Sequence, residues 1–191
     1  EDVAARNGAV TISRRPQIGS NIRYAGSDME RGALLVGAGT NLTPHHIGLL
    51  AANGYSSVNV VQLPRIALFS TGDELARPGE RAEPGQIYDS NKPMLMALLA
   101  ELGLFADDLG ALPDDLLTTQ ALMSDCRNRY DLLISTGSVS VGERDFLQSA
   151  FLAAGGSVKN WKVAVKPGKP VLFGKLGNTI FTGLPGNPFA A

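Results

Sequence analysis

The chain has 191 residues, of which 44% are hydrophobic and 18% are charged, and its formal net charge is -1. This length suits one ordinary domain plus part of another, and it can bury a core without disulfides or a structural metal. The composition excludes collagen, a coiled coil and bulk disorder, and the near-zero net charge argues against nucleic acid as a partner.

The single cysteine, Cys126, excludes an intrachain disulfide framework and a multi-cysteine zinc site, and it fits a reducing cytoplasmic compartment. No apolar run approaches the length of a membrane span, so we expect no membrane association, and the first residues lack the features of a signal peptide. The chain begins at Glu1 and ends soon after a Gly-Asn-Pro turn. We therefore expect a fragment of a longer protein.

Residues 1–63 are predicted to hold part of a β-rich region and a linking helix. Short alternating or apolar runs predict strands at 10–13, 21–24 and 32–36. Thr43 and Pro44 suit the N-cap and first turn of a helix over 46–52. We expect short strands that lead into one packing helix.

From residue 64 onward, predicted strands and helices alternate. Apolar runs predict strands at 65–69, 104–109, 132–134, 158–165, 171–173 and 179–181. Apolar periodicity predicts helices at 91–102, 114–128 and 145–154. This alternation is typical of a three-layer α/β domain with a mainly parallel sheet, which we assign to residues 64–191 and expect to be truncated at its C-terminal end.

Ligands of such sheets bind beyond the carboxyl ends of the strands. We therefore expect ligand-binding residues in the loops that follow the predicted strands. In the loop at 70–75, the adjacent carboxylates of Asp73 and Glu74 suit a hard cation such as magnesium, although solvated acids in an ordinary turn would have the same sequence. A second loop carries Asp114 and Asp115. Helix capping is the favoured explanation for this second pair when it is considered alone.

Two later loops suit an anion. Residues 135–145 are rich in Ser and Gly and precede a helix, so their N–H groups can form an anion site, although no Gly-Lys-Ser/Thr follows and this is not a Walker loop. Lys166 and Lys169 lie on a rigid Pro/Gly turn that is paired with the Gly/Pro-rich segment 183–188. These lysines can meet an anion as point charges, or the turn can be a plain connector.

The order of these motifs closely resembles the molybdopterin molybdenumtransferase family, which includes the E domain of gephyrin. The motifs are Ser-Thr-Gly-Asp-Glu-Leu at 70–75, Gln-Ile-Tyr-Asp-Ser-Asn at 86–91, Ser-Thr-Gly-x-Val-Ser-Val-Gly at 135–142, Lys-Pro-Gly-Lys-Pro at 166–170 and Leu-Pro-Gly-Asn-Pro at 184–188. The resemblance implies a molybdopterin-binding-like fold and a cytoplasmic homodimeric transferase of molybdenum cofactor biosynthesis. Such an enzyme inserts molybdate into adenylylated molybdopterin, releases AMP and uses magnesium.

The resemblance also implies roles for individual residues, which we state as expectations. Catalytic roles are implied for Glu74, Asp145, Asp114 and Asp115, and metal binding is implied for Glu74 and Asp145. Substrate binding is implied for Thr71, Gly72, Asp73, Ser135, Gly137, Ser138, Ser140, Gly142, Lys166, Lys169, Pro185 and Pro188. Which of Asp114 and Asp115 faces the ligand is open.

Two spatial expectations follow from a parallel sheet. Glu74, Asp145 and one of Asp114 or Asp115 follow three different strands, so we expect them to share one cleft with magnesium between them. The loops 136–142 and 166–170 are expected to converge on one oxyanion.

The chain departs from the family at Ser138, where a second glycine is usual, and it lacks the C-terminal β domain of the family. Activity of the fragment alone is therefore left open. Two alternatives are a related molybdopterin-binding domain with another activity, of the adenylyltransferase or competence-damage type, and a non-catalytic binding or scaffold module. The β-rich lead-in and the pair Asp73 and Glu74 argue against the first of these.

Overall fold

The computed structural model describes residues 3–15, 17–137, 146–162 and 170–189 of the chain. The chain divides into two compact units, Glu1–Val60 and Val61–Ala191, and each unit is considered by itself. Among the described residues, no helix has both the length and the apolar character needed to cross a membrane.

The first unit contains a hairpin and one helix. Strands β1 (Val3–Arg6) and β2 (Ala9–Ile12) pair antiparallel with Val3 opposite Ile12. Asn7 and Gly8 connect them with φ angles of 52° and 77°, the left-handed conformations that a two-residue Asn-Gly hairpin turn requires. Helix α1 (Pro44–Ala52) follows Thr43, whose side chain and backbone engage His46 in a capping box.

Two strands that the sequence predicts in this unit are wrong. Residues 21–24 and 32–36 form turns and irregular backbone rather than strands. Asn21 and Gly32 have φ angles of 58° and 89°, which extended strands do not tolerate, and the Ala33 N–H donates to the Glu30 carbonyl across a turn. A short alternating run forms a strand only when a partner strand is available, and the described residues provide none here.

The second unit is a three-layer α/β domain, as the sequence predicts. Its six-stranded sheet has the order β6-β3-β7-β10-β9-β8. The first four of these strands run parallel, whereas β9 runs antiparallel to both of its neighbours, β10 and β8. Their bounds are β3 (Ile66–Thr71), β6 (Ala106–Leu112), β7 (Leu132–Gly137), β8 (Gly156–Lys162), β9 (Pro170–Leu176) and β10 (Thr179–Pro185).

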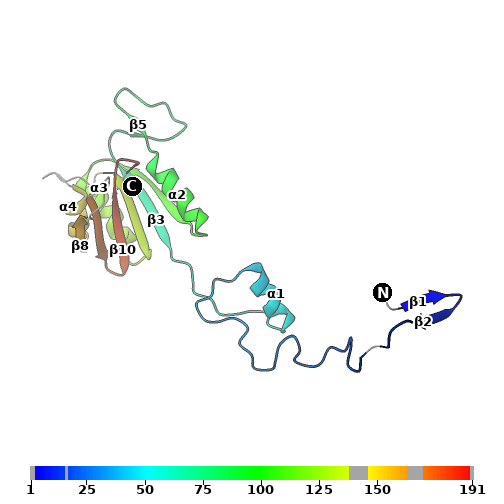
Figure 1. Cartoon of the computed structure of the whole chain (residues 1–191). Coiled ribbons are helices and arrows are strands. Elements are labelled where there is room, and N and C mark those ends of the chain that lie inside the picture. Colours follow the sequence, from blue (N-terminus) through cyan, green and yellow to red (C-terminus); the bar gives the residue numbers. More distant parts are fainter. Residues whose placement is uncertain (1–2, 16, 138–145, 163–169, 190–191) are drawn as a thin grey trace. The chain divides into compact units, whose positions relative to one another are not determined.

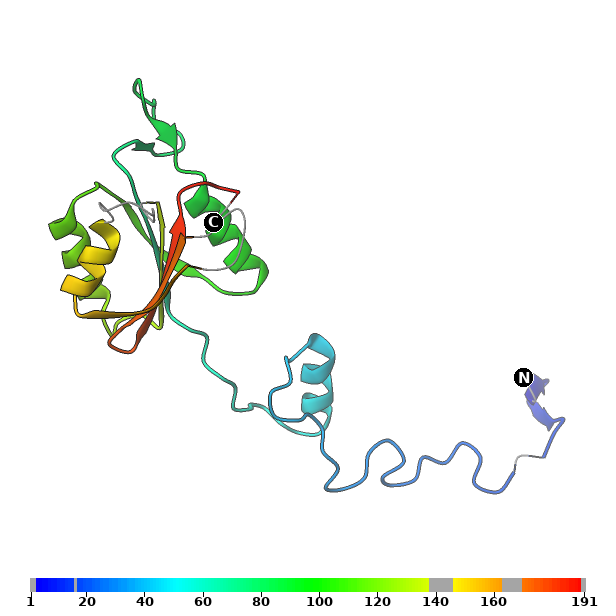
Figure 2. The same ribbon diagram turned by 60° about the vertical axis from the view of Figure 1, so that its left-hand side comes forward.

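Helices cover both faces of this sheet. Helix α2 (Asn91–Glu101) lies on one face, and helices α3 (Leu116–Cys126) and α4 (Phe146–Ala153) lie on the other (Figures 1 and 2). A second, two-stranded parallel sheet of β4 (Leu75–Ala76) and β5 (Ile87–Tyr88) projects from the domain at the end of β3. The predicted helix at 114–128 begins two residues later because Asp115 is its N-cap.

The core follows the two-residue period of the central strand. All six residues of β3 are buried. Ile66 and Leu68 pack toward α2, whereas Ala67 and Phe69 belong to the larger cluster on the α3 and α4 side. Because both faces are covered, the first four residues of this strand are a continuous apolar run rather than an alternating one, which explains why the sequence predicts it correctly.

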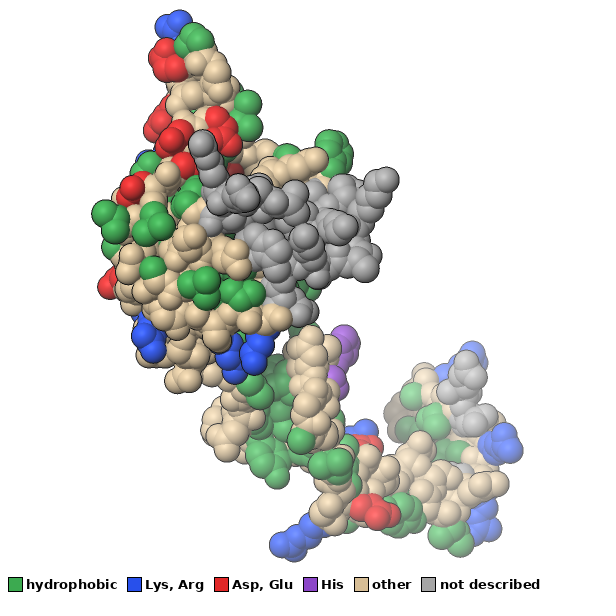
Figure 3. Space-filling view, turned by 90° about the vertical axis from the view of Figure 1, so that its left-hand side faces the viewer, with side chains coloured by type: hydrophobic (Ala, Val, Ile, Leu, Met, Phe, Trp, Pro, Cys, Tyr) green, Lys and Arg blue, Asp and Glu red, His purple; other side chains and the backbone are tan. Residues whose placement is uncertain are grey.

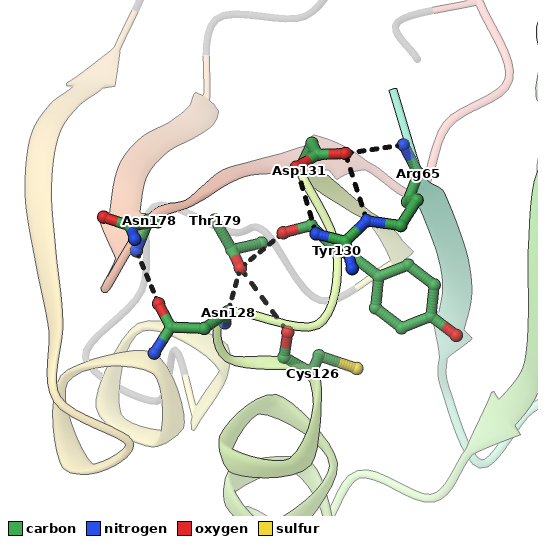
Figure 4. Close-up of polar contacts among 7 residues, drawn as sticks. All are labelled: Arg65, Cys126, Asn128, Tyr130, Asp131, Asn178 and Thr179. Carbon is green, nitrogen blue, oxygen red and sulfur yellow. Dashed lines mark hydrogen bonds and ion pairs between the residues drawn. The ribbon is translucent and has the colours of Figure 1, made fainter. Parts of the chain in front are cut away.

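A polar network ties the strands together at the end where they begin (Figure 4). The Thr179 Oγ1 atom lies 2.7 Å from the Tyr130 carbonyl oxygen and accepts the Asn128 N–H at 3.0 Å. The Asp131 carboxylate accepts from the Arg65 backbone N–H at 2.8 Å and from its guanidinium, which lowers the pKa of Asp131. These hydrogen bonds therefore hold the beginnings of β3, β7 and β10 together.

Candidate functional site

A pocket of about 210 Å³ opens at the other end of the sheet, where β3, β7 and β10 end. The carboxyl ends of parallel strands are the usual ligand sites of open α/β sheets. The residues that line it are Thr71, Glu74, Leu75, Ile87, Tyr88, Asp89, Ser90, Asn91, Thr136, Gly137, Gly186 and Pro188.

The loop after β3 brings a carboxylate to this pocket. Gly72 has a φ of 148°, and a Cβ atom at this position would meet Glu74 Oε2 at 2.7 Å. The Glu74 side chain therefore folds back over Gly72, which leaves an exposed carboxylate on the wall of the pocket. The Gly72 N–H donates to the Leu112 carbonyl at 3.2 Å, so the loop is held to the end of β6.

The end of β7 approaches the end of β3 closely. Gly137 has a φ of 126°, and a Cβ atom there would lie 2.1 Å from the Thr71 carbonyl oxygen. Only glycine fits this contact, and it places the start of the predicted anion loop against Thr71. Ser135 is fully buried just before it, and its Oγ atom has no hydrogen-bond partner in the described part of the chain.

The segment between β5 and α2 contributes residues that our expectations did not include. Asp89 is buried, and it accepts hydrogen bonds from the Ser70 hydroxyl and from the Lys92 N–H. Asn91, the first residue of α2, is buried beside it on the pocket wall. The signal in the sequence is the motif at 86–91, which supports the family resemblance but was assigned no site role.

Lys92 lies next to this segment and compensates its charge. Its Nζ atom is 2.9 Å from Asp108 Oδ1 and 3.8 Å from Asp89 Oδ2. Burial opposes ionisation of Asp108, but hydrogen bonds from Lys92 and Gly110 outweigh it, and the pKa of Asp108 is lowered. These ion pairs fix the first turn of α2 to β6. The Lys92 ammonium is thereby paired with carboxylates of the fold.

The second acidic loop behaves differently from the first. Asp115 Oδ2 accepts the Thr118 N–H at 2.7 Å as the N-cap of α3, and this hydrogen bond lowers the pKa of Asp115. The Asp114 N–H donates to Asp73 Oδ1 at 3.1 Å, which joins the loops after β3 and β6. Neither Asp114 nor Asp115 is among the described residues that line the pocket.

The structure thus brings part of the predicted site together. Thr71, Glu74, Gly137 and Pro188 line the pocket, and Gly72, Asp73, Ser135 and Pro185 are their neighbours in the chain. The predicted residues that lie outside the described residues are Ser138, Ser140, Gly142, Asp145, Lys166 and Lys169. Convergence of the loops 136–142 and 166–170 therefore stays a prediction, and so does the three-carboxylate cleft.

The described lining of the pocket is acidic. It contains the carboxylates of Glu74 and Asp89 and no Lys or Arg. Acidic side chains also gather at this end of the domain, around the base of the projecting segment that carries β4 and β5 (Figure 3). No group of three His, Cys, Asp or Glu side chains within the described ranges could hold a metal ion by itself. An anionic ligand here needs either lysines from elsewhere or a cation that brings some of its own ligands.

These features define a class of protein, the three-layer α/β domains with a ligand pocket at the carboxyl ends of parallel strands. Residues 67–191 match the family model described as a probable molybdopterin binding domain. Residues 1–54 match the model described as the MoeA N-terminal region, domains I and II. The chain therefore belongs to the molybdopterin-binding family in which these two regions occur together.

Curated relatives of this chain share one name. The chain is 42% identical to a molybdopterin molybdenumtransferase of Haemophilus influenzae over 185 residues, which are 97% of this chain and 46% of the relative. It is 38% identical to the protein of the same name in Bacillus subtilis, over 95% of this chain and 42% of the relative. The chain spans about half the length of these curated relatives.

A solved structure agrees with both matches. The molybdopterin biosynthesis MoeA protein from Pyrococcus horikosii superimposes with a TM-score of 0.80 at 34% identity, and the superposition covers 99% of this chain and 47% of that structure.

Proposed function

We propose that this chain carries the substrate pocket of a molybdopterin molybdenumtransferase, which inserts molybdate into adenylylated molybdopterin and releases AMP. The observation that carries the proposal is the pocket at the ends of β3, β7 and β10, which is lined by residues of four of the five motifs that resemble the family. Relatives that bear this name match the chain over almost its whole length.

The roles of individual residues follow from the chemistry of this substrate. Thr71 and Gly137 both line the pocket, so a ligand group would meet the ends of β3 and β7, and Pro188 would shape the wall that follows β10, with Pro185 at the end of that strand. Lys166 and Lys169 supply the positive charge for molybdate or phosphate, since the described lining of the pocket carries none. Together they would hold a pyrophosphate and an oxyanion side by side.

The donors at the pocket also suit magnesium. Magnesium in proteins is typically bound by one or two carboxylates together with waters and substrate phosphates, so a complete protein cage is not required. Glu74 offers an exposed carboxylate on the pocket wall, and Asp145 is its proposed partner. Bound there, magnesium would neutralise charge on the phosphates of the substrate. The third acid would be Asp114 or Asp115, of which Asp115 also caps α3.

The proposal includes a homodimer in the cytoplasm, as the family resemblance implies. Domains of the adenylyltransferase or competence-damage type are a less suitable alternative, because the match of residues 1–54 to the MoeA N-terminal region adds a second region to the α/β domain. A scaffold without catalysis has no separate observation in its favour.

Incubation with adenylylated molybdopterin, molybdate and magnesium tests the proposal directly. The assay uses a protein that contains this chain and has the full length of the relatives. The expected result is release of AMP that requires molybdate, measured by chromatography. Binding of the adenylylated pterin without any AMP release would instead indicate a binding module. Absence of both binding and release would contradict the proposed function.

A further inference from the structure

Asn91 connects three elements at the pocket. It is the first residue of α2, and only 6% of its surface is exposed. Its Nδ2 amide group donates to Thr136 Oγ1 at 2.8 Å, near the end of β7. The same group reaches the Gly186 carbonyl oxygen at 2.9 Å and the Pro185 carbonyl oxygen at 3.4 Å, at the end of β10. These partners lie 45 to 95 residues away in the sequence.

The backbone segments at the ends of β10, β7 and β3 lie close together around these contacts. A Cβ atom on Gly186 would be in ordinary contact with Gly137 Cα at 3.6 Å, and Gly137 in turn lies against Thr71. Residues 186–188, which we call the β10 turn, therefore pass directly over the glycine that ends β7. Within the turn, Asn187 Oδ1 accepts the Phe189 N–H, and Asn91 is the described side chain that links the turn to another element.

The first turn of α2, which carries Asn91, is held by several polar contacts. Asp89 accepts the Lys92 N–H at 3.2 Å and the Ser70 hydroxyl, and the Lys92 ammonium lies 2.9 Å from Asp108. These contacts fix the first turn of α2 to β3 and β6. Because this first turn of α2 is fixed, the Asn91 side chain on it can set the position of the β10 turn.

The chemistry of the Asn91 side chain suits holding two acceptors. Its amide nitrogen has two hydrogens, whereas a carboxylate in the same shape has none and would repel the Gly186 carbonyl. Its Oδ1 atom is buried and has no hydrogen-bond partner in the part of the chain that the structure describes. A buried acceptor without a donor lowers stability, so this residue is not the choice that stability alone would favour.

We propose that Asn91 is a positioning residue of the pocket, which holds the β10 turn against the end of β7 and so sets the opening through which the substrate enters. It does not itself need to touch the reacting atoms. Its effect on ligand affinity rests on the proposed function, whereas its hold on the turn does not.

Amide hydrogen exchange of the peptide 183–189 tests the hold on the turn. Asn91→Leu keeps a similar volume and removes the donors, so the protection factor of this peptide should fall about tenfold or more. Thr179→Val is the matched control, since it removes a buried hydroxyl at the other end of β10. It should lower the melting temperature and leave protection at 183–189 close to that of the parent. Parent-like protection in Asn91→Leu would overturn the proposal.

Asn91→Asp gives a readout that a merely structural role would not change. The new carboxyl, buried beside carbonyl oxygens, should have a raised pKa and can donate one hydrogen bond only when it is protonated. Protection of 183–189 should therefore be low at pH 8 and recover toward pH 5, whereas Asn91→Leu should not recover. Equal protection at both pH values, each relative to the parent, would contradict the positioning role.

Calorimetry with AMP tests the consequence for the ligand. Both Asn91 variants should bind AMP about tenfold or more weakly than the parent at pH 8, and Thr179→Val should bind it normally. If the parent itself does not bind AMP, the proposed function fails, and the exchange measurements still decide the positioning role. Unchanged AMP affinity together with increased exchange would show that the turn does not control this ligand.

Discussion

Glu74 is the exposed carboxylate among the described residues that line the pocket. Glu74→Gln keeps the shape and removes the charge. If magnesium acts at this carboxylate, AMP release by the full-length protein should slow by about 10²-fold while pterin binding survives. Glu101→Gln, at the exposed end of α2, is the control. Turnover close to the parent at saturating magnesium would make Glu74 an ordinary solvated acid.

Gly137 is a second single residue whose substitution has a predictable effect. Alanine there would need a φ of 126° and a Cβ atom 2.1 Å from the Thr71 carbonyl oxygen. Gly137→Ala should therefore lower the free energy of unfolding by about 2–4 kcal/mol, measured by urea denaturation. At Gly186, by contrast, a Cβ atom meets its nearest atom at 3.6 Å, so Gly186→Ala should be much better tolerated. A stable Gly137→Ala protein would mean that the close approach of β7 to β3 is wrong.

At the scale of single elements, the start of α3 separates capping from catalysis. Asparagine is as good an N-cap as aspartate, whereas alanine is poor. Asp115→Asn should therefore keep the melting temperature of the parent, and Asp115→Ala should lower it. AMP release should remain in Asp115→Asn if Asp115 only caps α3. Loss of AMP release in this stable variant would restore Asp115 as a catalytic candidate.

The starts of β3 and β7 are joined by Arg65 and Asp131, and this contact predicts a pH dependence. Because the hydrogen bonds from Arg65 lower the pKa of Asp131 below its ordinary value of 3.8, the contact stabilises the fold above that pH. Its contribution is lost as the pH falls through the lowered pKa. Asp131→Asn should therefore be less stable than the parent at pH 7, and the difference should shrink at pH 3.

Urea denaturation at the two pH values measures this difference. Asp125→Asn is the control, since Asp125 forms an exposed ion pair with Arg129, just past the end of α3, and such pairs contribute little. A difference between Asp131→Asn and the parent that grows toward acid pH would contradict the assigned direction.

Across the whole molecule, the sequence predicts the α/β domain well and the first unit poorly. The apolar run over 66–69 is decisive because a strand covered on both faces does not alternate between apolar and polar residues. The run at 21–24 has the same local appearance as a strand but lies in turns, because strand formation depends on a partner that no local pattern reveals. Asn91 was missed for a related reason: its partners are 45 and 95 residues away, and locally it only begins a helix.

The domain boundary that we propose near residue 63 is also testable. Residues 55–65 are all exposed, and they lie between α1 and β3. Proteinase K at a low ratio should cut in this stretch or in the exposed, irregular backbone before α1, and should leave a resistant fragment that extends from this stretch through β10. Mass spectrometry identifies the cut. First cleavage inside β3 or α2 would contradict an independently folded α/β domain.

Amide chemical shifts recorded during titration of this chain with AMP show whether the pocket at the ends of β3, β7 and β10 is the substrate site. If it is, the largest changes should map to Thr71, Asn91 and Thr136, with little change at Asn128 and Thr179 at the other end of the sheet. Changes centred on Asn128 and Thr179, or none at saturating AMP, would contradict it.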